Sequence, residues 1–283
     1  MSTPDPADVD PTAVVAAVRR ACRDAGEPDP LDEAADLRLV RDGLTALPHW
    51  VATDGFAVVR DEELDLAVAP HARRHGTGAD LVGRAVAATP GRLTAWSHGD
   101  HPGAAALAAA YGFERVRELW VMRRPTAEPL PQAGVPDDVT VRSFRPGADE
   151  DALLAVNAAA FADHPEQGDL DRDGLAQRMA EPWFDPDDLL LAVAPDGELL
   201  GFHWTKRHDA EHGEVYVVGV APSAQGRGLG RVLTVAGLAH LAERGIAEVH
   251  LYVEGDNTPA TTLYGDLGFT RARSDTHVQY LRG

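Results

Sequence analysis

The chain has 283 residues, of which 44% are hydrophobic and 25% charged, as in a soluble globular protein with one large or two ordinary domains. Its formal net charge of −19 argues against nucleic acid as a partner, because such binding depends on Lys and Arg neutralising phosphates. No apolar run reaches about eighteen residues and the acidic start lacks a secretory pattern, so neither a membrane span nor export is expected. The single cysteine, Cys22, excludes an internal disulfide and suits a reducing cytoplasm.

The first half of the chain combines helical and strand patterns. Apolar spacing predicts helices at residues 11–25 and 31–43, the second ending at a glycine. The pattern then predicts a hairpin of residues 50–51 and 56–59 around Thr53-Asp54-Gly55, and a strand at residues 64–68.

The second half follows a segment, residues 125–138, whose prolines are typical of a stiff linker. The helices predicted after it are at residues 150–162 and 171–181, after the loop at 225–230, and from Asn257 onward. The predicted strands are at residues 139–144, 189–194, 199–206, 215–220, 248–254 and 276–281, with Gly268 and Phe269 expected to open the last one.

Residues 66–78 repeat residues 218–230, so that Gly76 and Gly78 align with Gly228 and Gly230. A single long period of this kind indicates a duplicated domain. We therefore expect an α/β fold of the α+β type, with a first domain at 1–124, the linker at 125–138 and a second domain at 139–283. Each domain is expected to hold a mixed sheet flanked by helices.

The loop Gln225-Gly226-Arg227-Gly228-Leu229-Gly230 lies between a predicted strand and a predicted helix. Alternating glycines let backbone N–H groups converge, and a helix N-terminus favours an anion, so the loop is a candidate phosphate site. It lacks the Lys-Ser/Thr ending of a P-loop, and its glycines lie closer together than in the dinucleotide fingerprint.

This loop resembles the Gln/Arg-x-x-Gly-x-Gly signature of the GNAT N-acetyltransferases, which grip the pyrophosphate of acetyl-CoA. The following strand, Asn257 and Tyr264 also match the family pattern. The resemblance implies two tandem GNAT-like domains with mostly antiparallel sheets, and acetyl-CoA as cosubstrate without a metal. The coenzyme positions it implies are Val218, Gly219, Val220, Gln225, Gly226, Arg227, Gly228, Leu229, Gly230, Arg231, Asn257, Thr258, Pro259, Ala260, Thr261 and Thr262. In the first domain they are Leu66, Ala67, Val68, Arg73, Arg74, His75, Gly76, Thr77 and Gly78, although Arg73 and Arg74 replace the Gln and Gly of the second loop.

Acetyl transfer requires the amine to lose a proton and the leaving thiolate to gain one. Glu214, just before the central strand, is the candidate base. An amine with the pKa of an α-amino group is partly neutral at pH 7, so a carboxylate acting through water suffices. Tyr264 is the candidate acid; its counterpart in the first copy is Ala108, which cannot donate a proton. We therefore expect the second domain to be the enzyme.

The segments around Asn157, Trp183, Gly201 and Glu214 are similar to those of the mycothiol synthase family. That resemblance implies acetylation of the cysteinyl amine of Cys-GlcN-Ins by direct attack on the thioester. It implies substrate contacts from Glu33, Glu166, Lys206, Glu214 and Tyr252, with Lys206 the only lysine of the chain.

Alternative functions are a two-domain GNAT acting on another amine, such as an aminoglycoside or a protein N-terminus, and a non-catalytic acyl-CoA sensor. Retention of both Glu214 and Tyr264 argues against the sensor. The spacing of His208 and His212 is compatible with a metal pair, but a polar turn without a third ligand favours a surface loop. The protein is expected to be a monomer.

Overall fold

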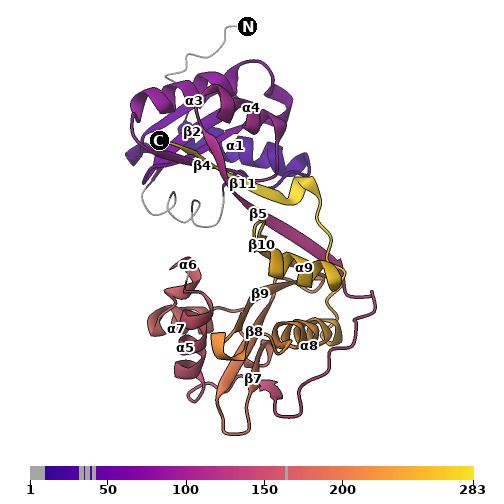
Figure 1. The fold of residues 1–283 in the computed structure, drawn as a ribbon. Coiled ribbons are helices and arrows are strands. Elements are labelled where there is room, and N and C mark those ends of the chain that lie inside the picture. The colour runs from indigo at the N-terminus through magenta and orange to yellow at the C-terminus, as the bar shows by residue number, and fades with distance from the viewer. Residues whose placement is uncertain (1–9, 32–34, 36–38, 40–42, 163–164) are drawn as a thin grey trace. The chain divides into compact units, whose positions relative to one another are not determined.

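The computed structural model describes residues 10–31, 35, 39, 43–162 and 165–283 (Figure 1). Its contacts form two compact units. Unit 1 comprises Met1–Trp120, Glu254–Asp256 and Ala272–Gly283, and unit 2 comprises Val121–Val253 and Asn257–Arg271. The domain boundaries expected at residues 124 and 139 remain a prediction. The last strand belongs to unit 1, because it pairs with strands of the first half of the chain. Most of the helix expected at 31–43 lies outside the described residues.

Unit 1 is built on a sheet whose strands follow the order β1-β2-β3-β4-β11-β5. β3 and β4 are parallel, and the other neighbours in this series are antiparallel. The strands are β1 (His49–Ala52), β2 (Gly55–Arg60), β3 (Glu63–Val68), β4 (Leu93–Ser97), β5 (Glu114–Pro125, in this unit to Trp120) and β11 (Thr276–Arg282). The helices are α1 (Pro11–Asp24), η2 (Leu44–Ala46), η3 (Pro70–Ala72), α3 (Thr77–Ala88), α4 (Pro102–Ala110) and η6 (Arg273–Asp275).

Strand β2 shows why this sheet has helices on both faces. All six of its residues are buried, and they alternate between two cores. Phe56 and Val58 pack in the core that includes Val14 and Val18 of α1, whereas Ala57 and Val59 pack in the core that includes α3. A strand buried on both faces reads as a continuous apolar run, as this one does.

Unit 2 contains the series β10-β9-β8-β7-β6, in which only β9 and β10 are parallel. Its strands are β6 (Thr140–Ser143), β7 (Leu189–Val193), β8 (Leu199–Arg207), β9 (His212–Val220) and β10 (Glu248–Glu254). Its helices are α5 (Glu150–Ala160), α6 (Pro165–Gly168), α7 (Arg172–Met179), η4 (Pro186–Asp188), η5 (Pro222–Ala224), α8 (Leu229–Glu243) and α9 (Thr258–Asp266). The expected mixed, mostly antiparallel fold with flanking helices is confirmed.

Helices cover both faces of the unit 2 sheet, with α8 on one face and α5 on the other (Figure 1). A Cβ added at Gly201 of β8 would meet Leu233 of α8 at 3.1 Å. One added at Gly219 of β9 would instead meet Phe161, which follows α5, at 3.3 Å. These two glycines allow close packing against the two layers of helix.

The parallel strands of each unit separate before they end. β9 and β10 pair only from His212 to Val215, although β9 continues to Val220. β3 and β4 pair only at Glu63 and Leu64, although β3 continues to Val68. The backbone groups of β9 beyond Val215 therefore have no partners on β10, and the same holds for β3 and β4.

The last strand begins later in the chain than the sequence predicted. Gly268 and Phe269 do not open the last strand: Thr270 forms only an isolated bridge with Arg123, and β11 begins at Thr276.

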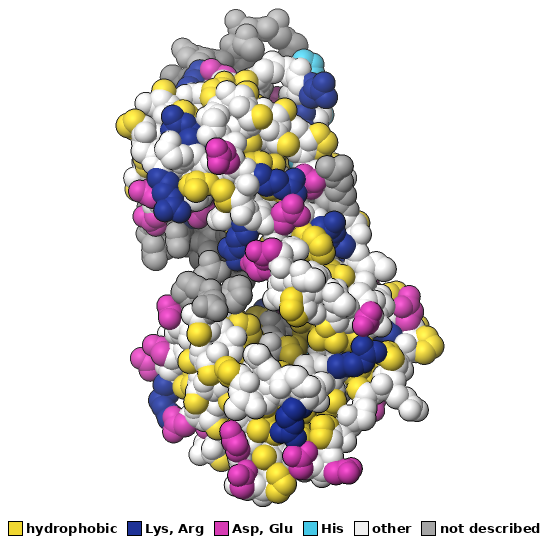
Figure 2. All heavy atoms as spheres, in the orientation of Figure 1, with side chains coloured by type: hydrophobic (Ala, Val, Ile, Leu, Met, Phe, Trp, Pro, Cys, Tyr) yellow, Lys and Arg dark blue, Asp and Glu magenta, His cyan; other side chains and the backbone are white. Residues whose placement is uncertain are grey.

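Among the described residues, no helix has the length and apolarity needed to cross a membrane. Figure 2 shows basic and acidic side chains intermingled over the face it displays.

Candidate active site

The two glycine-rich loops have nearly the same backbone conformation. Ala69 and Ala221, which precede η3 and η5, have identical φ and ψ angles of −52° and 136°. Left-handed φ angles follow at Arg74 (69°) and Gly76 in unit 1, and at Gly226 (78°) and Gly228 in unit 2. Each loop then runs directly into a helix, α3 or α8. The first amides of a helix have no acceptor within it, and a loop that runs into a helix start is therefore suited to an anion.

Each loop contacts two corresponding elements of its own unit, the strand before it and a later helix. A Cβ on Gly230 at the start of α8 would meet Leu263 of α9 at 3.8 Å and Val220 at the end of β9 at 4.0 Å. A Cβ on the corresponding Gly78 would meet Leu107 of α4 at 3.1 Å and Val68 at 3.7 Å. The start of α8, at the end of the loop, therefore lies beside the end of β9 and beside Leu263, which follows the predicted coenzyme positions of α9.

Asn257 is the N-cap of α9, and its side chain accepts a hydrogen bond from the backbone N–H of Ala260 at 3.1 Å. His101 has the same role in unit 1, where its Nδ1 accepts from Gly103 at 3.0 Å. The sequence alignment of Asn257 with His101 is therefore matched by their position at a helix start. A cap of this kind satisfies amides that the first turn leaves unpaired.

Two arginines of the second loop are held by carboxylates. Nη2 of Arg227 lies 2.7 Å from each carboxylate oxygen of Asp138. Arg231 Nη1 lies 3.7 Å from Asp266 on α9. Both arginines remain about one third exposed, so their guanidinium groups are accessible to an anion from solvent.

The first loop differs in its side chains. Arg73, aligned with Gln225, donates to both carboxylate oxygens of Glu27 at 2.7 and 2.6 Å and to the carbonyl of Val68 at 2.9 Å. The hydrogen bond to Arg73 lowers the pKa of Glu27, and the same bond raises the pKa of Arg73. Burial is the main cause of a raised pKa at Cys22, which lies 3.8 Å from Arg73 Nη2. The predicted coenzyme residue Arg73 is thus engaged within its own unit.

Glu214 lies at the point where β9 and β10 begin to separate, and it is 8% exposed. Nε2 of His208, which follows β8, lies 2.7 Å from Glu214 Oε2. Nε2 of His250 on β10 lies 3.9 Å from the same oxygen. Burial is the largest cause that lowers the pKa of His250. The base predicted from the sequence is therefore flanked by two imidazoles, neither of which sequence reasoning assigned to it.

Lys206, Glu214 and His250 are paired residues on β8, β9 and β10. Paired residues on neighbouring strands point to one face of a sheet, so these three side chains share a face. The ammonium of Lys206 lies 4.7 Å from the ring centre of Trp183 and 5.4 Å from that of Tyr216, within cation–π range. The structure thus brings together two of the predicted substrate residues, Lys206 and Glu214.

Tyr252, the third of them, lies two residues beyond His250, and the two rings are 5.7 Å apart. Its side chain is 48% exposed. Partial burial and then the charge of Glu214 raise the pKa of the Tyr252 hydroxyl. The remaining predicted substrate positions cannot be placed: Glu33 and the side chain of Glu166 lie outside the described residues.

Tyr264 projects from α9 into the protein and is 9% exposed, with its ring 5.8 Å from that of Phe269. Burial raises the pKa of Tyr264 to about 12, so the hydroxyl keeps its proton throughout the neutral range. The raised pKa makes Tyr264 a weaker acid than an exposed tyrosine, so it would donate its proton only as negative charge develops on a leaving group beside it.

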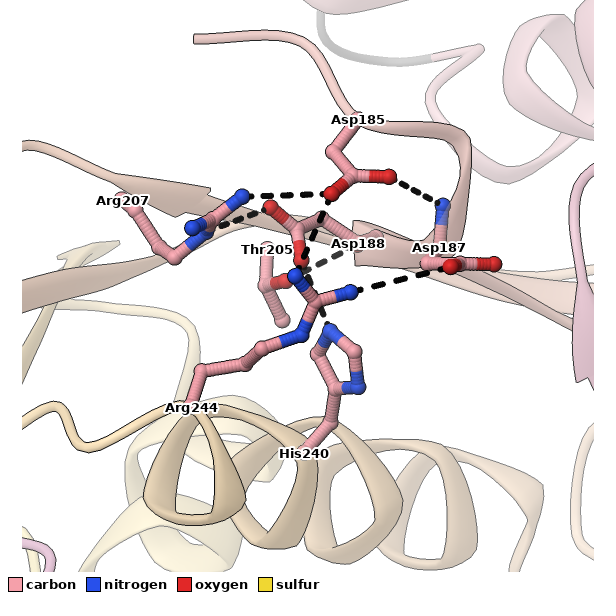
Figure 3. A network of polar contacts seen from close by, with 7 residues as sticks. All are labelled: Asp185, Asp187, Asp188, Thr205, Arg207, His240 and Arg244. Carbon is pink, nitrogen blue, oxygen red and sulfur yellow. Dashed lines mark hydrogen bonds and ion pairs between the residues drawn. The ribbon is translucent and has the colours of Figure 1, made fainter.

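A buried polar network anchors the end of β8, the strand that contains Lys206 and directly precedes His208 (Figure 3). Asp188 is 1% exposed and accepts hydrogen bonds from Arg207 Nε at 2.9 Å and His240 Nε2 at 2.7 Å. Thr205 donates to the backbone carbonyl of Asp188 at 2.8 Å. A buried carboxylate with several donors fixes its partners tightly, so this network positions the strand end. Its members are far apart in sequence, which is why sequence reasoning missed it.

A pocket of about 510 Å³ opens beside this strand end. Trp183, Phe184, Arg207 and His208 contribute to its lining. His208 therefore borders the pocket while it contacts Glu214, and Trp183 borders it while it contacts Lys206. The pocket lies next to the carboxylate and ammonium groups expected to bind a polar substrate.

Comparison with known proteins identifies the family of the chain. The model of the Acetyltransferase (GNAT) family matches residues 154–269. A mycothiol acetyltransferase from Nocardioides sp. is 58% identical over 95% of this chain and 97% of its own length. Among solved structures, a GCN5-related N-acetyltransferase from Sphaerobacter thermophilus has 25% identity and a TM-score of 0.72, covering 99% of this chain and 93% of its own. A tandem GNAT protein from the clavulanic acid biosynthesis pathway has 20% identity and a TM-score of 0.64, covering 96% and 95%, and shares the fold. The chain is an N-acetyltransferase and belongs to the mycothiol acetyltransferase family of tandem GNAT proteins.

Proposed function

We propose that this enzyme acetylates the cysteinyl amine of Cys-GlcN-Ins to give mycothiol, with acetyl-CoA, the cosubstrate of GNAT enzymes, as the donor. The name of its relative from Nocardioides sp. supports this acceptor. The observation that carries the proposal is the shared face of β8, β9 and β10, where a buried carboxylate, Glu214, lies beside Lys206. A hydroxyl-rich acceptor that bears an ammonium group needs such a mixture of anionic and donor groups.

In the proposed reaction, the neutral amine attacks the carbonyl carbon of the acetyl thioester. Glu214 accepts the proton that the nitrogen loses, directly or through a water molecule. A backbone N–H within residues 218–220, where β9 has left β10, would stabilise the oxyanion. The carbon–sulfur bond then breaks, and the hydroxyl of Tyr264 gives its proton to the thiolate of coenzyme A. Glu214 then releases its proton to solvent and the phenolate regains one from solvent, so the enzyme returns to its starting state.

The coenzyme would bind with its diphosphate at the loop of residues 225–230 and its pantetheine along the separated end of β9. The contact region of Gly230, Val220 and Leu263 supports this path, since it joins the loop, the strand and α9. Unit 1 has a corresponding helix, α4, with its N-cap at His101, but it carries Ala108 where unit 2 carries Tyr264. We therefore assign the chemistry to unit 2.

The test is an acceptor panel with purified protein and acetyl-CoA. Release of coenzyme A would be measured with Cys-GlcN-Ins, glucosamine, an aminoglycoside and a peptide with a free N-terminus. A site that hydrogen-bonds its proper substrate rejects analogues that lack those groups, so we expect kcat/KM for Cys-GlcN-Ins to exceed the others by about 100-fold or more. Similar turnover of all four would contradict this acceptor. Absence of release with every amine would contradict the enzyme assignment and favour a sensor.

A further inference from the structure

We propose that His208, Glu214 and His250 form a binding site for a divalent cation of the zinc class. Among the described residues, their three ligand atoms lie within 4.8 Å of one another. Cation binding does not depend on the identity of the acceptor. Only its effect on turnover rests on the proposed role of Glu214 as the base.

The distances within the cluster are close to those that a tetrahedral ion requires. Zinc binds imidazole nitrogen and carboxylate oxygen at about 2.0–2.2 Å, which separates neighbouring ligand atoms by about 3.3 Å. Glu214 Oε2 lies 2.7 Å from Nε2 of His208 and 3.9 Å from Nε2 of His250. Shifts of well under 1 Å in each side chain, which small changes of the side-chain torsion angles allow, would make the two distances equal.

The donor set is one that zinc favours over magnesium or calcium. Two imidazoles and one carboxylate are typical ligands of zinc, whereas magnesium and calcium prefer oxygen ligands alone. The ligands come from β9, β10 and the residue that follows β8, so the sheet register fixes their backbones. The hydrogen bond from Arg207 to Asp188 also restrains the backbone at His208, because Arg207 directly precedes His208.

Three protein ligands leave a fourth position for water or another small ligand. His208 has a 36% exposed side chain, so an ion can reach the cluster from solvent. The pocket lined by His208 provides room on that side. The spacing of His208 and His212 in the sequence indicates a different pair, but His212 Nδ1 instead lies 2.9 Å from Asp209 and does not belong to the cluster.

Occupation of this site would stop acetyl transfer. The ion would draw electron density from the Glu214 carboxylate, which would then be too weak a base to take a proton from the amine. The positive charge would also repel an ammonium substrate. Cation binding and turnover are therefore mutually exclusive, and the cation acts as an inhibitor that competes with the acceptor.

The direct test is titration of the chelator-treated full chain with Co²⁺, followed by its visible absorption, and then displacement by Zn²⁺. We expect the intense bands of tetrahedral Co²⁺ and loss of these bands when Zn²⁺ is added. His250→Ala and His208→Ala should each weaken binding by at least about tenfold. His212→Ala is the matched control and should bind like the wild type. A spectrum that stays that of aqueous Co²⁺, or equal binding by His250→Ala and the wild type, would overturn the proposal.

A second readout separates this proposal from the proposed function. Zn²⁺ should raise the Tm of the wild type and of His212→Ala, but not that of His250→Ala or His208→Ala. It should inhibit wild-type turnover, with full recovery after EDTA, and inhibit His250→Ala only at concentrations at least about tenfold higher. Cation binding without any acetyl transfer would remove the proposed function and leave the site intact. Normal acetylation with no shift in Tm would remove the site and leave the function intact.

Discussion

Tyr264 of α9 and Ala108 of α4 occupy the same position in two copies of one motif, the same number of residues after the N-caps Asn257 and His101. Both are almost fully buried, at 9% and 8% exposure. The duplication has therefore preserved the backbone and the burial at this position while only one copy carries a hydroxyl. From this difference we infer that the leaving thiolate is protonated in unit 2.

Replacement of Tyr264 by Phe should lower kcat by about 10²-fold or more, because the thiolate would leave without its proton donor. Binding of acetyl-CoA should change little, since the ring and its packing against Phe269 remain. Steady-state kinetics and calorimetric titration with acetyl-CoA measure the two effects. Tyr111→Phe is the control, because Tyr111 in unit 1 also loses a hydroxyl, one that donates to Ala79. Equal rates for Tyr264→Phe and the wild type would exclude Tyr264 as the acid.

The ionisation of Tyr264 can be observed directly. Burial raises its pKa to about 12, whereas tyrosine in an unfolded chain ionises near about 10. The neutral phenol therefore contributes stability that is fully present below about pH 10 and is lost as the pH rises through about 12. The difference between the tyrosinate absorbance titrations of the wild type and Tyr264→Phe should show a transition near the upper value. A transition at the ordinary pKa would mean that the side chain is solvated.

The ion pair between Arg227 and Asp138 should compete with coenzyme binding. Asp138 lies at the end of the proline-rich segment and holds the guanidinium through both carboxylate oxygens. Surface pairs of this type contribute about 0.2–1 kcal/mol, so Asp138→Asn should tighten binding of coenzyme A by roughly 1.4- to fivefold. Calorimetry at low and high salt would measure it, and the gain should shrink at high salt. The control, Asp137→Asn, removes a negative charge from the neighbouring residue. An equal gain in coenzyme A affinity by this variant would indicate a general effect of net charge.

Glu27 should stabilise unit 1 through Arg73. Glu27→Gln removes the charge of a partly exposed pair and should lower the free energy of unfolding by about 0.5–1 kcal/mol at pH 7. Because hydrogen bonding to Arg73 lowers the pKa of Glu27, this contribution is present above the pKa of the unfolded chain and is lost as the pH falls through the folded value. Urea unfolding at several pH values should therefore show the two proteins converging in acid. Glu62→Gln, at an exposed position, serves as the control, and a difference between wild type and Glu27→Gln that stays constant as the pH falls would contradict the ion pair.

Local patterns in the sequence predicted most of the elements. The strand at residues 248–254 and the neighbouring strands at residues 189–194 and 199–206 were predicted correctly to within a residue at each end, because alternation and turn chemistry act over a few residues. The pairing of β11 with β4 and β5 could not be predicted in this way. It joins segments from opposite ends of the chain, and no local signal specifies which strand a distant segment will pair with.

The candidate site shows the same division. Glu214 was selected as a candidate from the sequence because it adjoins a recognisable strand and loop. His250 was missed as its neighbour, since only the parallel register of β9 and β10 brings the two together. A search for polar residues on the strand after the loop helix, rather than for close spacing around His208, could have suggested it. The conformation of Arg74 could not be predicted from its residue type. Its left-handed φ of 69° occurs at the position that Gly226 occupies in the second loop, whereas arginine by itself favours a negative φ.

A crystal structure with coenzyme A bound tests the central claim most directly. Our account predicts diphosphate oxygens within hydrogen-bonding distance of backbone amides in residues 225–230, and the Tyr264 hydroxyl within about 3.5 Å of the coenzyme sulfur. Glu214 should lie on the opposite side of the thioester carbon from that sulfur, where an attacking amine would approach. A diphosphate bound elsewhere in unit 2, or a sulfur remote from Tyr264, would contradict the account.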